Sequence, residues 1–433
     1  MAYLLFILVN ATLFIRPAEI MPEVAAWPIY QVLILACFVV ALPSVLDHLQ
    51  SRPLAEQPIT LCVFGIWAAV VMSHLSHFFI WGARMDGMEF GKIVIYYLLL
   101  VSLVDSERRL RNFLFLLTLF IITLAALALL QYHGKINIPS LAALERHDIT
   151  SAGERIELLQ LRSTGIFNDP NDLAMILVPG VVLCLYFALD RAGSLLRAGW
   201  LFPLGMLFYA FALTNSRGGF LAMLAALTTL AYYRWGWKKA FAAAALVVPV
   251  LFAALKGRMT DLEIEGGTGQ SRVQLWSEAL GLFKQAPIFG IGRGNMVEEG
   301  YQVAHNSFVH AFTELGLFGG TFFLGAFFIG LVVFHRLTRH PETSEFPELH
   351  RAIPYLAAVL VGFAVSMLSL SRNYVVPTYM ILGLAAIAQR LASDRLEIRL
   401  VQFDSRLASR LAVLSVGFIL ATYVFIRATV RWS

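Results

Sequence analysis

Long runs of apolar residues without a single charge recur along this chain of 433 residues. The runs Asn112 to Leu130 and Phe241 to Leu255 are uncharged throughout, and several such runs reach the roughly 20 residues that a helix needs to cross a bilayer. Hydrophobic residues make up 59% of the chain and charged residues 14%, so one soluble core cannot hide this surface. The runs are continuous rather than alternating, which excludes an outer-membrane barrel. Because backbone groups in lipid must bond internally, the sequence predicts an all-α polytopic membrane protein.

The apolar runs divide the chain into about 12 or 13 predicted transmembrane helices. The predicted spans are residues 2–15, 28–46, 58–81, 92–104, 112–131, 173–189, 199–214, 217–233, 240–255, 306–335, 353–371, 375–390 and 411–427. A thirteenth span puts the two termini on opposite sides of the membrane, whereas a twelve-span chain has them on one side.

Lys and Arg concentrate in alternate short loops, which the positive-inside rule assigns to the cytoplasm. The basic residues behind the net charge of +5 therefore indicate the orientation of the chain in the membrane, and no nucleic-acid partner is expected. Two long loops are left outside the cytoplasm, and long structured loops in a compact bundle are usually functional. The expected parts are N-terminal helices (1–131), a first long loop (132–172), central helices (173–255), a second long loop (256–305) and C-terminal helices (306–433).

The first long loop ends in a polar stretch. Asp169-Pro170 is a turn signal, and Asn171 or Asp172 is expected to cap the next helix. A turn with a cap accounts for Asn168 to Asp172. It leaves Arg162 unexplained, which makes this residue a candidate anion contact.

Arg217 follows a tight turn between two predicted spans, with Ser216 as the expected N-cap. A charged residue near membrane depth costs about 2.5–3.5 kcal/mol on insertion scales, and a basic residue at a helix N-terminus opposes the helix dipole. A bound anion would offset both costs. We therefore expect Arg217 to bind an anion; the alternative is snorkelling to the interface.

The second long loop contains a stretch with helical spacing of apolar residues, which predicts an amphipathic helix resting on the membrane interface. These residues are Val273, Trp276, Ala279, Leu280 and Phe283. With Ser271 as N-cap, Arg272 is expected in the first turn. Two arginines at helix starts suggest one bidentate anion clamp, for which the fixed guanidinium fork is suited.

Glycines and a histidine precede the longest span. The stretch Pro287 to Asn295 has glycine spacing like a phosphate loop, but it follows a helix rather than a strand, which favours tight structural turns. His305 stands at the start of the span, where the positive helix end and the arginines disfavour imidazolium. A neutral imidazole is what a general base requires, so a catalytic role is expected for His305 over a structural one. Gly316, Gly319 and Gly320 are predicted to share one helical face and allow close packing.

Four further residues are weaker candidates. His74 and His77 are expected to be structural, since no third metal ligand is evident. Arg372, at a span end, is a candidate for the anion site. Glu314 lies inside a span and needs a partner, for which the arginines are candidates. No aspartate pair typical of metal-dependent glycosyltransferases is evident, which favours chemistry without a metal or other cofactor.

Two motifs resemble the O-antigen ligase and polymerase superfamily of bacterial inner-membrane proteins. Arg217 and Leu221 match an arginine, three residues and a leucine. His305-Asn306, nine residues and Gly316-Leu317-Phe318-Gly319 match the histidine motif of the ligases. The stretches Phe167 to Asn171 and Arg272 to Trp276 also look like the family. The resemblance covers about residues 160–320.

The resemblance implies a metal-independent glycosyltransferase of the membrane (GT-C-like) type, with its site on the periplasmic side of the inner membrane. The implied donor is a glycan on undecaprenyl pyrophosphate, and the implied acceptor of the ligases is a sugar of lipid A-core. Arg217 and Arg272 are implied to hold the pyrophosphate, and His305 to activate the acceptor hydroxyl. Arg162 and Arg372 are expected to assist the donor site, with Asn168, Asn306 and Glu314 in support. Membrane lipids surround the bundle, and the family suggests inversion at the sugar.

Other functions stay open at this stage. A polymerase extending the lipid-linked glycan, or a protein O-oligosaccharyltransferase, would use the same donor with another acceptor. A flippase for lipid-linked oligosaccharides would line a path through several spans with charges, whereas here the spans are largely uncharged. A structural scaffold would leave the arginines and the histidine unexplained.

Overall fold

The computed structural model describes residues 1–24, 26–149, 155–189, 198–242, 244–245, 268–298, 300–340, 346–396 and 400–430. The chain divides into two compact units. Unit 1 comprises Met1–Pro43, Leu103–Leu262 and Ser344–Ser366. Unit 2 comprises Ser44–Ser102, Glu263–Thr343 and Met367–Ser433.

Unit 1 is built around one helix that is buried on almost every side. This helix, α7 (Pro170–Ala188), packs against α6 (Glu107–Tyr132), α9 (Leu201–Thr214), α10 (Arg217–Trp235) and α15 (Pro347–Ser366). A helix that is apolar all round belongs in a protein interior. Two glycines allow the close approach, since a Cβ at Gly180 of α7 would lie 2.6 Å from Ile121 of α6, and one at Gly362 of α15 would lie 2.8 Å from Ala226 of α10.

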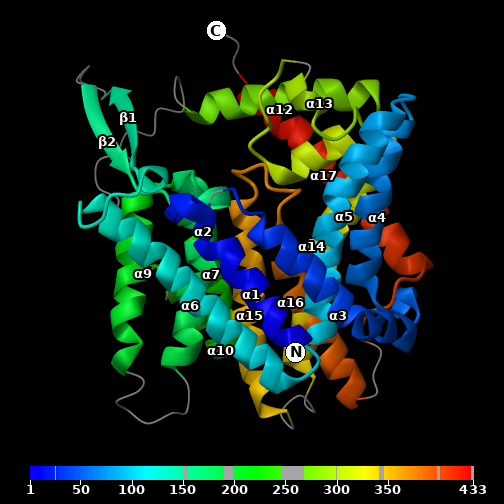
Figure 1. Ribbon diagram of the computed structural model, residues 1–433. Coiled ribbons are helices and arrows are strands. Elements are labelled where there is room, and N and C mark those ends of the chain that lie inside the picture. The colour runs from blue at the N-terminus through cyan, green and yellow to red at the C-terminus, as the bar shows by residue number, and fades with distance from the viewer. Residues whose placement is uncertain are drawn as a thin grey trace. The chain divides into compact units, whose positions relative to one another are not determined.

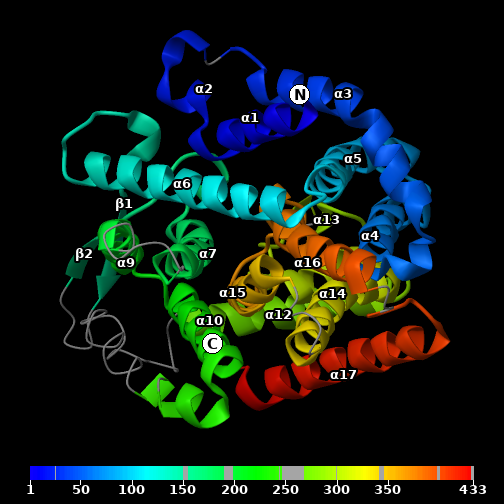
Figure 2. The ribbon, with the colours of Figure 1, turned by 90° about the horizontal axis from the view of Figure 1, so that it is seen from below.

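The remaining elements of unit 1 surround this core. Helix α1 (Ala2–Ile15) lies beside α6 (Figure 2) and is followed by the short α2 (Pro17–Ile20). The first half of α3 (Ile29–Ser51) belongs to this unit, and the unit boundary falls at Pro43 inside that helix. Strands β1 (Leu144–Ile149) and β2 (Arg155–Gln160) form an antiparallel hairpin, with Leu144 opposite Gln160. The first long loop was predicted to be structured, but this hairpin was not foreseen.

Unit 2 is built around α14 (Ser307–Arg339), which packs against α4 (Pro58–Leu75), α12 (Thr268–Gln285), α16 (Val376–Leu396) and α17 (Ser405–Thr429). Gly65 of α4 lies against the ring of Phe322, and Gly319 of α14 lies against Ala69. Helix α5 (Ile80–Leu103) and the four-residue α13 (Asn295–Glu298) complete the unit. Helix α12 lies beside the C-terminal part of α17 (Figure 1), where the rings of Trp276 and Phe425 are 5.8 Å apart.

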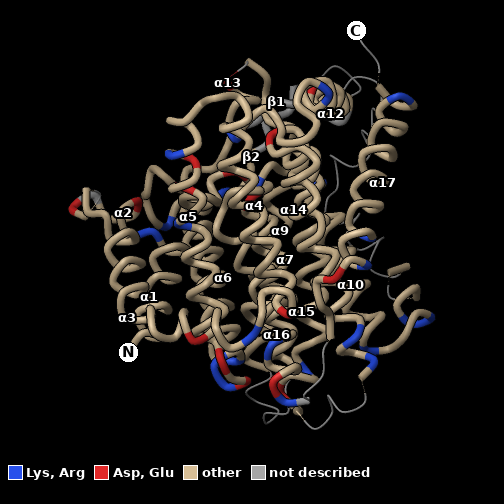
Figure 3. The backbone as a smooth tube through the Cα atoms, turned by 90° about the vertical axis from the view of Figure 1, so that its right-hand side faces the viewer, with Lys and Arg blue, Asp and Glu red and all other residues tan. Residues whose placement is uncertain are grey.

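The predicted spans coincide with helices wherever the structure describes them. Among the described residues, eight helices are long and apolar enough to cross a membrane by length and composition. They are α1 with α2, α3, α4, α6, α7, α14, α15 and α17. Helix α6 shows the pattern clearly, because its charged residues stand in the first turns and the rest is uncharged (Figure 3). The prediction of an all-α polytopic membrane protein is confirmed. Most of the predicted span 240–255 lies outside the described residues.

Two boundary predictions were wrong. The span predicted at 92–104 is the second half of α5, which begins at Ile80 and has 24 residues. The first half carries Arg84, Asp86 and Glu89, and these charges conceal the helix from a search for apolar runs. The span predicted at 58–81 ends at Leu75, where the chain turns through Phe78, whose φ is 58°.

Helix α14 is broken at Gly316, whose φ of 65° and ψ of −166° are not helical. The prediction that Gly316 shares a helical face with Gly319 and Gly320 was therefore wrong. A break leaves backbone groups without helical partners, and at membrane depth this is tolerated only where other protein groups satisfy them. The turn segment 287–292 does so through four hydrogen bonds. Ile291 N–H donates to Thr313 O (3.1 Å), Gly292 N–H to Glu314 O (3.1 Å), Leu317 N–H to Pro287 O (2.8 Å) and Phe318 N–H to Ile288 O (3.0 Å).

Two glycines make this pairing possible. Gly290 has a φ of 76°, and a Cβ there would lie 2.2 Å from the carbonyl carbon of Glu314. A Cβ at Gly316 would lie 2.3 Å from Ile288 O. The glycine-rich stretch therefore has the structural role that the sequence favoured over a phosphate loop.

Replacing Gly290 by alanine should destabilise unit 2. The left-handed backbone alone costs an L-residue about 1–2 kcal/mol, and the Cβ also meets backbone atoms that cannot move without breaking the pairing. We expect a clear drop in the melting temperature of the purified protein in detergent. Gly281→Ala is the matched control, because a Cβ there meets nothing within 4 Å. An unchanged melting temperature in Gly290→Ala would contradict the close packing of the loop on α14.

Candidate active site

In unit 1 the turn before Arg217 is joined to the end of the first long loop. Ser216 caps α10, as predicted, by accepting a hydrogen bond from Gly219 N–H (3.0 Å). Its hydroxyl also donates to Asn171 Oδ1 (2.7 Å). The backbone joins the same two segments, since Leu161 N–H donates to Leu213 O (2.9 Å). Two motifs about 45 residues apart therefore meet, and Arg217 begins its helix beside them.

The cap of α7 was predicted two or three residues too late. Asp169, and not Asn171 or Asp172, is the N-cap, and its carboxylate accepts from Asn171 N–H (2.8 Å). Pro170 is the first residue of the helix, where its missing N–H costs nothing and its fixed φ suits the helix. Asn171 is thereby left to bond Ser216.

The other two candidates of unit 1 lie in the same loop. The Arg162 guanidinium donates to the carbonyl of Ala142, so this side chain ties the loop to the residues before the hairpin. Asn168 follows the short 3-10 helix Gly165–Phe167 and is exposed. The structure gives Arg162 a structural bond that the sequence could not indicate.

In unit 2 His305 occupies a strained turn directly before α14. Its φ is 47°, in the left-handed region that L-residues other than Asn, Asp and His rarely adopt. Asn306 is the N-cap of α14, and its side chain accepts from the N–H groups of Phe308 (3.1 Å) and Val309 (3.2 Å). The predicted place of His305 at the start of this helix, with Asn306 in support, matches the structure.

Ser307, the first residue of α14, is clamped by the segment before α16. Its N–H donates to Met367 O (2.8 Å) and its hydroxyl to Leu370 O (2.6 Å). The hydroxyl oxygen also accepts from Arg372 N–H (2.8 Å), and Asn373 Nδ2 donates to Ser307 O (3.0 Å). The backbone of Arg372 therefore lies beside Ser307, which is two residues after His305 in the sequence.

Arg272 lies on α12, which packs against the start of α14. The helix begins at Thr268, so Arg272 stands in its second turn and Ser271 is not the N-cap. The prediction of an arginine in the first turn of this helix was therefore wrong, whereas the helix itself is confirmed. Trp276, one turn further along α12, donates from Nε1 to Ala304 O (2.8 Å), the residue before His305. Arg272 and His305 are thus carried by elements that are hydrogen-bonded to each other.

Glu314 is paired, but not with an arginine. Its side chain is 1% exposed, and its carboxylate accepts from Gly294 N–H (2.9 Å) and lies 3.1 Å from His310 Nε2. The predicted arginine partner is replaced by a histidine on the same helix and by the loop backbone. Glu314 therefore holds the glycine-rich loop against α14.

A second polar cluster in unit 2 was not predicted. Asp86 of α5 contacts His74 Nε2 (2.6 Å) through one oxygen and Arg293 Nη1 (2.8 Å) through the other. The Arg293 guanidinium lies 5.1 Å from the centre of the Tyr374 ring. Burial, with the Glu314 carboxylate adding to it, holds the pKa of the Tyr374 phenol well above its usual value, so this ring stays neutral. The i, i+3 pair His74 and His77 was the sequence signal here; a structural role was favoured for it, but its partners Asp86 and Gly290 were not foreseen.

The histidines at 74 and 77 have structural partners, as favoured from the sequence. His74 bonds Asp86, and His77 Nε2 donates to Gly290 O (2.9 Å). Within the described part of the chain, no group of three or more His, Cys, Asp or Glu side chains could hold a metal ion.

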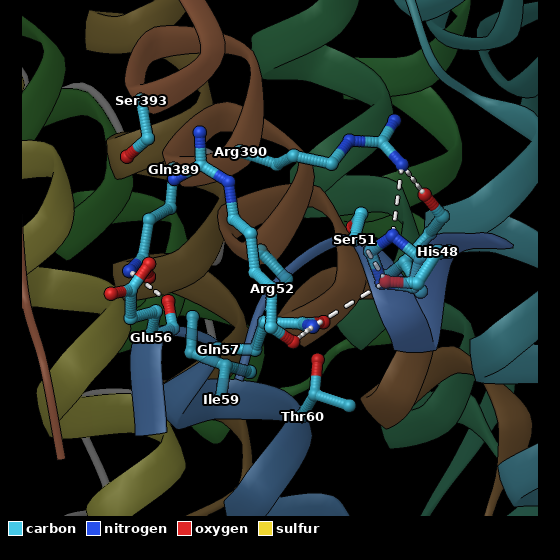
Figure 4. Close-up of a pocket in the computed structure, with 12 residues that line it drawn as sticks. His48, Ser51, Arg52, Glu56, Gln57, Ile59, Thr60, Gln389, Arg390 and Ser393 are labelled. Carbon is cyan, nitrogen blue, oxygen red and sulfur yellow. Dashed lines mark hydrogen bonds between the residues drawn. The ribbon is translucent and has the colours of Figure 1, made fainter. Parts of the chain in front are cut away.

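A polar cavity of about 30 Å³ lies in unit 2 between the residues shown in Figure 4. It is lined by His48, Arg52, Gln57, Gln389 and Arg390, among others. Its arginines already bond protein groups, Arg52 to Asp394 (2.7 Å) and Arg390 to the carbonyl of Val101. The volume suits one or two water molecules and is too small for a sugar or a pyrophosphate.

Residues 202–324 match the model of a protein family described as O-antigen ligase. The predicted resemblance is thereby confirmed, and the matched residues include Arg217, Arg272, His305 and Gly316. Comparison with curated proteins gives no match.

The matched residues fall partly in unit 1 and partly in unit 2. Arg217 belongs to unit 1, and Arg272, His305 and Glu314 belong to unit 2. Arg162 and Arg372, the weaker candidates, lie outside the matched residues.

Replacing Ser307 by alanine should loosen the start of α14. The change removes the donor to Leu370 O and the acceptor of Arg372 N–H, and a buried polar group without a partner costs about 1–3 kcal/mol. We expect the melting temperature of the variant to be lower than that of the native protein. Ser73→Ala is the matched control, since the buried Ser73 hydroxyl bonds only Val70 O three residues earlier in its own helix. Equal melting temperatures for the two variants would show that the clamp contributes nothing.

Proposed function

We propose that this protein transfers a glycan from undecaprenyl pyrophosphate to a sugar of lipid A-core, on the periplasmic face of the inner membrane and without a metal. The match of residues 202–324 to the O-antigen ligase family supports glycan transfer in O-antigen or lipopolysaccharide biosynthesis. The observation that carries the finer proposal is the strained turn of His305. This residue is the first of the histidine motif of the ligases, and hydrogen bonds anchor the residues on either side of it, Ala304 and Ser307. The bond to Ala304 comes from α12, the helix that also carries Arg272.

The reaction assigns one task to each kind of residue. The acceptor hydroxyl oxygen attacks the anomeric carbon, and the bond between that carbon and the phosphate oxygen breaks. The pyrophosphate leaves with the electron pair, so negative charge grows on it in the transition state. Guanidinium groups placed beforehand stabilise such charge without reorganisation, and this is the role we propose for Arg217 and Arg272.

His305 takes the proton of the acceptor hydroxyl in this proposal. A neutral imidazole serves as such a base, and the positive end of α14 favours that neutral form. A single base with no protein nucleophile leads to direct displacement, so the configuration at the sugar inverts. Arg372 supports the donor site from the segment beside α14, and Arg162 contributes through the loop it stabilises.

The sidedness follows from charge. The arginines at the C-terminal end of α14, Arg336 and Arg339, mark the cytoplasmic side by the positive-inside rule. The other end of α14, with His305, then faces the periplasm, where a polyprenyl donor would arrive laterally through the membrane. A polymerase would use the same donor with a lipid-linked glycan as acceptor, and the assay below separates the two.

Purified protein should transfer a defined glycan from undecaprenyl pyrophosphate to lipid A-core in the presence of a chelator. Arg217→Ala, Arg272→Ala and His305→Ala should each lower the rate at least 100-fold, because each removes stabilisation or proton transfer in the transition state. Lysine at either arginine position should restore part of the rate, since it keeps the charge and loses the fork. Product formation is followed by the shift of the acceptor on a gel.

The controls are substitutions of the same kind at exposed positions. Arg84→Ala on α5 and His133→Ala after α6 should leave transfer unchanged. Full activity in His305→Ala would overturn the general base, and loss of transfer on chelation would overturn the metal-free mechanism. Transfer only to a lipid-linked glycan would identify a polymerase.

A further inference from the structure

We propose that Trp276 is a positioning residue, whose indole N–H holds the backbone of His305 in its left-handed conformation. The inference rests on the proposed function, because it assigns Trp276 to the base of that reaction. Trp276 acts through His305 and is not itself a catalytic residue.

The first observation is the strain at His305. A residue other than glycine in the left-handed region persists only where surrounding contacts determine its conformation. On the C-terminal side these contacts are the Asn306 cap and the Ser307 clamp. The N-terminal side needs a contact of its own, because the peptide plane between Ala304 and His305 sets the φ of His305.

Trp276 supplies that contact. Its Nε1–H donates to Ala304 O at 2.8 Å, and this carbonyl belongs to the peptide plane in question. Ala304 is fully buried in an apolar cluster against which the Trp276 ring packs. The other members of the cluster are Ala279, Leu282, Ile291, Met296 and Val309. The indole therefore fixes both the position and the rotation of this plane.

The same helix carries Arg272, one turn before Trp276. Residues four apart lie on the same face of a helix, so the bond to Ala304 also sets where Arg272 stands relative to His305. Thr313 Oγ1 donates to Ala279 O (3.1 Å) and gives a second bond between α12 and α14. Two hydrogen bonds thus join α12 to α14 and to the turn before it. The bond from Trp276 is the one that reaches the turn containing His305.

The chemical consequence concerns the rate and not the affinity. A general base works only within hydrogen-bond reach of the proton it takes, and a misplacement of about 1 Å can cost about 100-fold in rate. Loss of the Trp276 bond should therefore lower kcat and leave the KM for the donor nearly unchanged.

The test is Trp276→Phe in the full-length purified protein, assayed with saturating lipid A-core and varied donor. We expect kcat to fall about 10- to 100-fold and the donor KM to change less than about threefold. The matched control is Trp67→Phe, since Trp67 is also partly buried in unit 2 and its Nε1–H donates to a backbone carbonyl, Gly87 O, at 2.7 Å. Both variants lose one indole hydrogen bond, but only Trp276→Phe should show a lower kcat.

A second pair of measurements separates positioning from packing. Replacing Trp276 by β-(3-benzothienyl)alanine keeps the ring shape and removes only the N–H; it should reproduce the fall in kcat with a melting temperature no lower than that of Trp276→Phe. In the His305→Ala background, Trp276→Phe should cause no further loss of the residual rate, because effects that act through one residue do not add.

The outcomes distinguish this inference from the proposed function. Native kcat in the benzothienyl variant, or a further loss in the double variant, would overturn the role of Trp276 while His305→Ala remains inactive. Full activity in His305→Ala alone would overturn the proposed base, and the positioning role with it.

Discussion

The requirement that every backbone group in a membrane bundle find a partner governs the arrangement of unit 2. Gly316 breaks α14, and the break leaves carbonyl and N–H groups that no water could satisfy at membrane depth. The turn segment 287–292 bonds four of them, and these bonds fix the loop against α14. The approach is close because neither Gly290 nor Gly316 has a Cβ.

The buried charged side chains of unit 2 bind or support the same loop, residues 287–294. Glu314 accepts the N–H of Gly294, and His77 donates to the carbonyl of Gly290. Asp86 holds Arg293 from α5 and is itself bonded by His74. An unpaired charge or polar group in such surroundings is costly, and here each group contacts the loop or holds a residue that does. The loop continues through α13 to Ala304, so these contacts also determine how the chain enters the turn of His305.

The sequence predicted those features that depend on neighbouring residues. Hydropathy predicted the helices, and the cap at Ser216 and the amphipathic α12 followed from short-range patterns. Two of the failures involve a partner distant in the sequence. The spacing of Gly316, Gly319 and Gly320 fits one helical face, but the backbone of Gly316 is not helical, and the segment about 25 residues earlier bonds the groups that the break exposes. Charges in the first half of α5 concealed that helix, and one of them, Asp86, pairs with Arg293 more than 200 residues away.

The candidate site shows the same limit more sharply. The motif from His305 to Gly319 is legible in the sequence, yet nothing within it explains why His305 adopts a left-handed backbone. That conformation is held from Trp276, about 30 residues earlier, and from the segment Met367 to Asn373, about 65 residues later. A motif therefore identifies a candidate base, whereas its backbone conformation depends on residues that the motif omits. For a base that must meet a hydroxyl within hydrogen-bond reach, these distant contacts are as much a part of the site as the histidine itself.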